Sequence, residues 1–187
     1  MAQKLSGCRK VLKNMWNKNI QIENRLKYWL LDVKSLSYRI SNIAKLEIIP
    51  VKERKNRVFS NEKKVFGYKK SEDLYLREVL IYADKVPIMY ARTILPIIHL
   101  RGFWRNIKKL KNKPLADIVF KKKILRSNFK FRKPSYNDEF SKRIRRFSLK
   151  KTKILAIRES TFRNKNEKVL LTEVFFNNIN QFQYLDD

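Results

Sequence analysis

The chain has 187 residues and carries 45 lysines and arginines against 17 acidic residues, a formal net charge of +28. Its hydrophobic content of 43% excludes disorder throughout, and a chain of this length forms one domain by default, with roughly 70% of its unfolded surface buried. The single cysteine, Cys8, excludes an intramolecular disulfide, and the longest apolar stretches fall short of the ~18 residues that a membrane span needs. We therefore expect a soluble, cytoplasmic monomer of one domain, residues 1–187, with no membrane insertion.

The positive charge by itself favours a nucleic-acid partner. Cations occur nearly everywhere in the chain, however, and no Gly-rich RNA-binding signature or zinc-binding His/Cys pairing accompanies them. A composition rich in Lys, Asn and Ile is also what a coding sequence drifting toward A and T produces. We expect loose, salt-dependent RNA binding and no specific nucleic-acid partner, and a basic RNA-binding protein remains an alternative.

Residues 1–19 show no firm period and form a poorly defined N-terminal segment. From Ile20 the apolar residues recur at spacings of three and four, which predicts an amphipathic helix. Ser35 is typical of an N-cap, and a second helix is predicted from Leu36 to Ile43. A strand interrupted by Pro50 is expected over residues 46–51. Residues 52–70 are interpreted mostly as a connection, with weak strand candidates at 58–59 and 65–68.

The most strongly patterned stretch is Leu74 to Pro96, LYLREVLIYADKVPIMYARTILP, which predicts a β-hairpin with its turn at residues 83–86. Alternation in each arm places an arginine, Arg77 or Arg92, on a face with apolar neighbours. A buried guanidinium stays charged and needs an anionic partner, from the protein or from a ligand. A solvated sheet edge or a core salt bridge explains the pattern equally well.

Helical spacing predicts a third helix over residues 100–110, and Pro114 marks the start of a fourth. The first N–H groups of a helix lack partners within it and can bind a carboxylate or phosphate. The backbone amides of Leu36 and Leu115 are candidates for this role, although most helix starts face water.

The last quarter predicts a strand over residues 124–131, a charged linker over 132–146 and a second hairpin, with strands at 153–161 and 169–176. A polar tail of residues 177–187 follows. Glu173 shares a strand face with hydrophobic residues. Buried alone, its carboxylate would have a raised pKa and suit proton transfer or the binding of a hydroxyl; beside an arginine it would be ionised and structural.

The sequence contains no catalytic triad, phosphate-binding Gly loop, dinucleotide fingerprint or metal-ligand cluster. His99 is the only histidine and is interpreted as a core or surface residue. An enzyme, if this is one, is expected to work without a metal or cofactor.

The chain resembles the chorismate lyases, enzymes that convert chorismate to 4-hydroxybenzoate and pyruvate as the first committed step toward ubiquinone. The resemblance spans residues 25–176 and rests on YWLLDVKSLSYRI, LREVLIYADKVPIMYARTILP, NKPLADIVF and VLLTEVFF, in that order. It implies an α+β domain in which helices cover an enclosed ligand site on an antiparallel β-sheet, with no metal and no cofactor. The sequence departs from the family at Leu36, where methionine is usual, at Ala91, where glycine can precede the arginine, and in its higher charge.

The resemblance implies that Arg77 and Glu173 act in catalysis and bind substrate, and that Leu36 and Leu115 bind it through backbone amides. Arg77 and the two amides are expected to hold the carboxylate that stays on the ring, and Glu173 the hydroxyl end. We further expect Arg92 to bind the departing pyruvyl carboxylate or to guide the substrate inward. A non-catalytic small-molecule-binding domain, like the effector domains of some bacterial repressors, is the other alternative.

Overall fold

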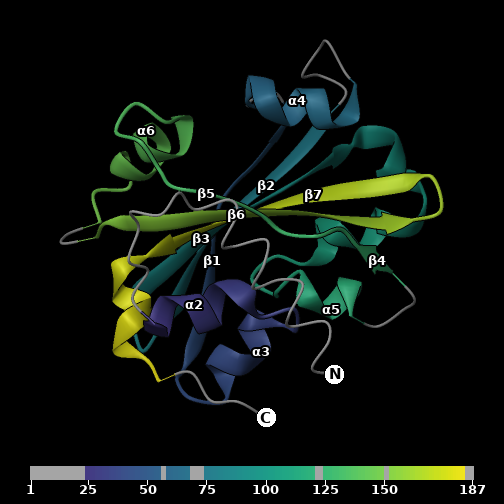
Figure 1. Ribbon diagram of the computed structural model, residues 1–187. Coiled ribbons are helices and arrows are strands. Elements are labelled where there is room, and N and C mark those ends of the chain that lie inside the picture. Colours follow the sequence, from purple (N-terminus) through teal and green to yellow (C-terminus); the bar gives the residue numbers. More distant parts are fainter. Residues whose placement is uncertain (1–23, 56–57, 68–73, 121–123, 150–151, 184–187) are drawn as a thin grey trace.

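The computed structural model describes residues 24–55, 58–67, 74–120, 124–149 and 152–183. Its centre is an antiparallel sheet of seven strands in the order β1-β2-β3-β7-β6-β4, with β5 also paired to β6. Helices cover both faces of this sheet: α2, α3 and α5 lie on one side, and α4 and α6 on the other (Figure 1). The expected α+β class is confirmed. In the described part of the chain, no helix is long and apolar enough to cross a membrane.

The first predicted hairpin is present as β2 (Leu74–Ala83) and β3 (Val86–Pro96), with the turn where it was predicted. Asp84 and Lys85 both have positive φ, 47° and 66°, which suits the right-handed twist of a two-residue hairpin. The Asp84 carboxylate also accepts a hydrogen bond from the backbone N–H of Lys45 at 2.8 Å. The pairing shifts by one residue between Ile81 and Tyr82, next to Pro87, which indicates a β-bulge.

The second hairpin consists of β6 (Ile154–Asn164) and β7 (Glu167–Phe176). Its strands are longer than expected, because β6 continues to the edge of a two-residue turn in which Lys165 has φ 50°. Strand β7 pairs with β3, so the two hairpins meet at the centre of the sheet. This pairing brings the middle of β7 beside the middle of the first hairpin.

The remaining strands lie at the two edges. The strand expected over residues 46–51 extends to form β1 (Leu46–Lys55), with a register shift just after Pro50. The strand expected over 124–131 is two short ones, β4 (Leu125–Arg126) and β5 (Lys130–Arg132), both paired with β6.

One face of the sheet is covered by α2 (Asn24–Leu31), α3 (Leu36–Ser41) and α5 (Ala116–Val119). The expected third helix is a pair of 3₁₀ helices, η1 (Ile97–Arg101) and η2 (Phe103–Lys109), separated by Gly102. Trp104 and Ile107 of η2 are fully buried three residues apart, which is the spacing at which 3₁₀ side chains align. The tail contributes η3 (Asn177–Gln181), whose Ile179 is fully buried.

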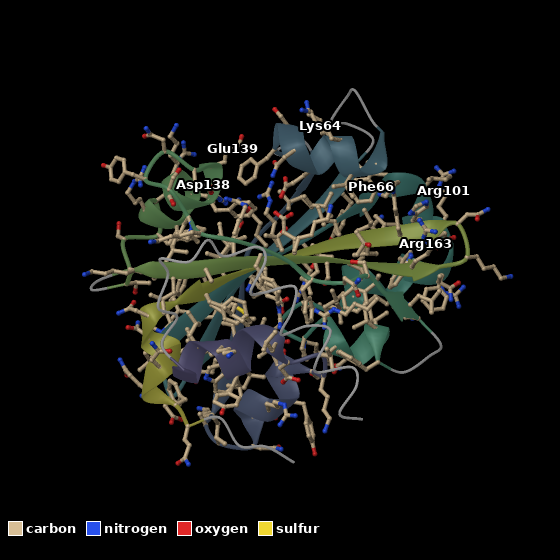
Figure 2. All side chains as sticks on the ribbon, viewed as in Figure 1. Lys64, Phe66, Arg101, Asp138, Glu139 and Arg163 are labelled. Carbon is tan, nitrogen blue, oxygen red and sulfur yellow. The ribbon has the colours of Figure 1, made fainter. Side chains whose placement is uncertain are left out.

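Two further helices correct the sequence interpretation. Within the expected connection lies α4 (Ser60–Phe66), which ends at Gly67 in the left-handed conformation (φ 73°). Within the expected charged linker lies α6 (Glu139–Arg145), capped by the Asp138 side chain, which accepts from the N–H of Phe140 at 2.8 Å. Figure 2 shows Asp138 and Glu139 together at the start of this helix, among charged side chains that point outward. Each helix buries only a few residues, so neither shows a strong apolar period.

Candidate active site

A pocket lies on the sheet face beneath α3 and α5. Side chains from the middle of β2, β3 and β7 form its floor, and residues around the starts of α3 and α5 form its wall. Four of the five predicted site residues line it: Leu36, Arg77, Leu115 and Glu173. The structure therefore brings together residues that are up to 137 positions apart in the sequence.

Arg77 lies on β2, directly opposite Thr93 of β3, and is 2% exposed. Its Nη2 donates to the backbone carbonyls of Lys111 and Lys113, at 2.9 and 2.8 Å. Lys111 has φ 47°, a left-handed conformation that costs a lysine on the order of 1 kcal/mol and needs such support. Arg77 thus fixes the loop that leads into Leu115.

The two backbone-amide candidates lie where short helices begin. Leu36 is the first residue of α3, which Ser35 caps by accepting from the N–H of Tyr38 at 3.2 Å. Leu115 immediately precedes α5, and its carbonyl accepts from Ile118 at 2.9 Å. The fourth helix therefore starts two residues later than Pro114 predicted. Both leucine side chains are buried, so each backbone is held firmly at the pocket wall.

Glu173 lies on β7 between Ala91 of β3 and Arg158 of β6. Its two carboxylate oxygens accept from Nε and Nη2 of Arg158, at 2.7 and 2.8 Å. Burial by itself would raise the pKa of Glu173, but the charge and hydrogen bonds of Arg158, with a smaller contribution from Arg126, lower it below its usual value. Glu173 is therefore an ionised carboxylate with an arginine partner.

Arg158 was not identified from the sequence, although it is fully buried beside the pocket. Its Nη1 donates to the carbonyls of Trp29, Leu30 and Asp32 at 3.3, 3.0 and 2.9 Å, and so ties the end of α2 to the sheet. Counting outward from the turn of the second hairpin would have placed Arg158 opposite Glu173.

Arg126 of β4 is the second residue that the sequence interpretation missed. It lines the pocket, and its Nη2 lies 3.4 Å from Oε2 of Glu173. The guanidinium carbon lies over the rings of Phe129 and Phe162, with the ring centroids 4.4 and 4.8 Å away. Its two-residue strand gave no alternation from which a face could be assigned.

Arg92 does not line the pocket, and the expectation that it meets a ligand beside Arg77 is corrected by the sheet register. An unbroken register from the two-residue turn would pair Arg77 with Arg92. Because of the bulge, Arg77 pairs with Thr93, while Arg92 pairs with Glu78 and points to the other face.

On that other face, Arg92 is 1% exposed and belongs to a buried charge cluster with Glu62, Glu78, Tyr90 and Arg143. Its Nε and Nη1 donate to Glu62 and Glu78 at 2.7 and 2.6 Å. This cluster attaches α4, through Glu62, and α6, through Arg143, to the sheet. Arg92 therefore has the protein partner that the salt-bridge interpretation required.

No group of three or more His, Cys, Asp or Glu side chains that could hold a metal ion occurs among the described residues. His99 lies outside the pocket lining, with Nδ1 3.3 Å from the carbonyl oxygen of Lys168. What the pocket does offer is buried cationic guanidiniums beside one carboxylate, an arrangement suited to binding a small anion.

Comparison with known proteins gives consistent results. The family model described as chorismate lyase matches residues 11–183. A protein of Nitrosospira multiformis named "Probable chorismate pyruvate-lyase" is 28% identical over 162 residues, 84% of this chain and 89% of the relative. One of Nitrosomonas eutropha with the same name is 26% identical over 160 residues, 83% and 89% of the two chains.

Among solved structures, the effector domain of PhnF from Mycobacterium smegmatis aligns with a TM-score of 0.53 at 10% identity, over 79% of this chain and 91% of that one. Likeness at this identity shows a shared fold.

Proposed function

Since the chain belongs to the chorismate lyase family, we propose that it converts chorismate to 4-hydroxybenzoate and pyruvate, the first committed step toward ubiquinone. The observation that carries this proposal is the meeting of Leu36, Arg77, Leu115 and Glu173 around one pocket. Each was expected there from the family resemblance, and they come from four separate segments of the chain.

Chorismate is a dicarboxylate with a hydroxyl on its ring. The reaction breaks the ring C–O bond to the enolpyruvyl group and the C–H bond at the neighbouring hydroxyl-bearing carbon. The electron pair of the C–H bond completes the aromatic ring, and the oxygen leaves with its bonding pair as the enolate of pyruvate. The ring carbon releases one proton and the enolpyruvyl methylene takes up one to give pyruvate, so the net proton count is unchanged. Aromatisation drives this elimination, so the protein's task is to fix two anionic groups and align the ring.

In the proposed complex, Arg77 and the amides of Leu36 and Leu115 hold the carboxylate that stays on the ring. Charge-assisted hydrogen bonds of this kind are strong in a site shielded from water. Arg77 also fixes the loop before Leu115. The Arg77 side chain therefore donates to the carboxylate and also positions a second donor, the amide of Leu115.

Glu173 is proposed to accept a hydrogen bond from the ring hydroxyl. A carboxylate whose pKa is lowered by Arg158 is a weak base, which supports orientation and polarisation of the hydroxyl over removal of the ring hydrogen. Arg158 has no direct part in this scheme and acts by holding Glu173 in place.

The test is to incubate the purified protein with chorismate, following 4-hydroxybenzoate by absorbance and pyruvate with a coupled dehydrogenase. We expect both products in equal amounts, with and without a chelator. As a matched control, Arg145→Met changes an exposed arginine that donates to the carbonyl of Tyr136 and should leave the rate unchanged.

Absence of product would refute the proposed lyase activity. Chorismate binding without product would favour a non-catalytic binding domain, and RNA binding that survives moderate salt would favour the basic RNA-binding interpretation.

A further inference from the structure

The pocket face carries more positive than negative buried charge. The described groups on this face include three largely buried guanidiniums and one carboxylate outside an ion pair with Arg39: Arg126 and Arg158 contact Glu173 directly, and Arg77 lies farther along the same face. Asp32 is also near, but Arg39 matches it with Nε 2.5 Å from Oδ2. Three positive charges against one leave two in excess among the described buried groups. A dianion would balance them.

The three arginines differ in how the protein engages them. Arg158 is bound to both oxygens of Glu173, and Arg77 donates to two carbonyls at short distances. The contacts of Arg126 are weaker: Nε donates to the neutral Ser160 hydroxyl at 3.1 Å, while Nη1 and Nη2 lie 3.5 and 3.4 Å from Val33 O and Glu173 Oε2. Its guanidinium therefore retains the most capacity for an additional anion.

Burial and charge point the same way. The Arg126 side chain is 15% exposed, so it reaches the pocket while being largely removed from water. The pKa of Arg126 is lowered to about 10, mainly because burial disfavours the charged guanidinium. The carboxylate of Glu173 raises this pKa, and the positive charge of Arg158 lowers it; the value includes both effects. A bound carboxylate would supply the negative charge that this environment lacks.

The sheet places Arg126 across the pocket from Arg77. A row of directly opposed residues on one face runs from Arg77 through Thr93 and Leu171 to Ser160, the residue to which Arg126 donates. Three strand spacings separate the ends of this row, roughly 14 Å between backbones, and both arginine side chains line the space above it. At its end of the row, the Arg126 guanidinium is held against the rings of Phe129 and Phe162.

Resting on the proposed function, we propose that Arg126 binds the second carboxylate of chorismate, the one on the enolpyruvyl group that departs. Arg126 takes the role that the sequence interpretation gave to Arg92. The product 4-hydroxybenzoate has only the ring carboxylate, so Arg126 contributes to substrate binding and not to product binding. It thereby discriminates a dicarboxylate from a monocarboxylate of similar ring size.

The experiment compares Arg126→Gln and Arg126→Lys with Arg132→Gln, a control that removes an arginine paired with Asp138 and Glu159. For each protein, kcat/KM for chorismate is measured together with the Kd for 4-hydroxybenzoate by calorimetry. We expect Arg126→Gln to lower kcat/KM roughly ten- to a hundredfold, the range of one charge-assisted hydrogen bond, with the Kd changed less than about threefold. Arg126→Lys should keep part of the activity, and Arg132→Gln all of it.

An unchanged kcat/KM in a folded Arg126→Gln would overturn the proposal. A parallel loss of 4-hydroxybenzoate affinity would also overturn it, because Arg126 would then act through Glu173. If the unmodified protein shows no turnover, the lyase activity fails by itself, and the same variants are compared for chorismate binding. Selective loss of chorismate affinity in Arg126→Gln would then still support the second-carboxylate site, and equal affinities would refute it.

Discussion

Removing Arg158 is expected to destabilise the protein strongly, and removing its partner as well should recover part of the loss. In Arg158→Met, the buried Glu173 loses two hydrogen bonds of 2.7 and 2.8 Å, and Arg126 at 3.4 Å is the partner that stays among the described residues. Breaking a buried ion pair in this way costs about 3–5 kcal/mol, or roughly 6–20 °C in Tm for a chain of this size. The double variant Arg158→Met/Glu173→Leu removes both charges, so its loss should fall short of the sum of the single losses by about 2–3 kcal/mol.

Urea denaturation followed by circular dichroism measures the unfolding free energies of the two single variants and the double variant. Arg145→Met serves as the exposed control and should lie within about 0.5 kcal/mol of the unmodified protein. Losses that add within about 0.5 kcal/mol would refute the reasoning, because they would show that Arg158 and Glu173 are not energetically coupled. The double variant should have no lyase activity even where its stability is recovered, since it lacks the carboxylate at the hydroxyl end.

Further predictions concern both faces of the sheet. Arg77→Ala should lower kcat/KM at least about a hundredfold, because a buried charged donor is lost. Near-normal turnover would refute the proposal that Arg77 binds the carboxylate that stays on the ring. Arg92→Met should lower Tm yet leave KM within about threefold, and a large rise in KM would show that Arg92 meets the substrate after all. The pKa of Glu173 is lowered in the folded protein, so the stability that its ionised carboxylate contributes is present above the ordinary pKa of 4.5 and is lost as the pH falls through the folded pKa. At a pH below the folded pKa, the unmodified protein and Glu173→Gln should therefore have similar unfolding free energies. Gly102→Ala places a Cβ against the Glu167 carboxylate, which must shift and give up the hydrogen bond of 3.0 Å that its Oε2 accepts from the N–H of Phe103. Thermal unfolding should therefore show a loss of about 1–2 kcal/mol.

Alternation and turn chemistry were enough to predict the two hairpins, because both are local properties of the chain. The helices α4 and α6 could not be predicted in this way. In α6, only Phe140 and Ile144 give an apolar spacing, and Arg143 meets Glu78 across 65 residues of sequence. Such a contact stabilises a helix through the tertiary structure and leaves no local pattern.

The candidate site was predictable where a charge interrupts an apolar strand, as at Arg77 and Glu173. The error at Arg92 has one physical cause, a single inserted residue in β3 that reverses the face of every residue beyond it. Arg126 was missed because its position depends on a two-residue edge strand and two aromatic rings from other segments.

Neighbouring residues Arg77 and Glu78 place opposite charges on opposite faces of β2, each with its own set of partners. A strand alignment shifted by one residue would exchange the faces and bury these charges against the wrong groups, at several kcal/mol each. Hydrophobic residues tolerate such a slip far better, because one apolar contact replaces another. The paired charges of β2, β3 and β7 therefore favour the native strand register over a shifted one. The residues that shape the pocket thus also select the register that creates it.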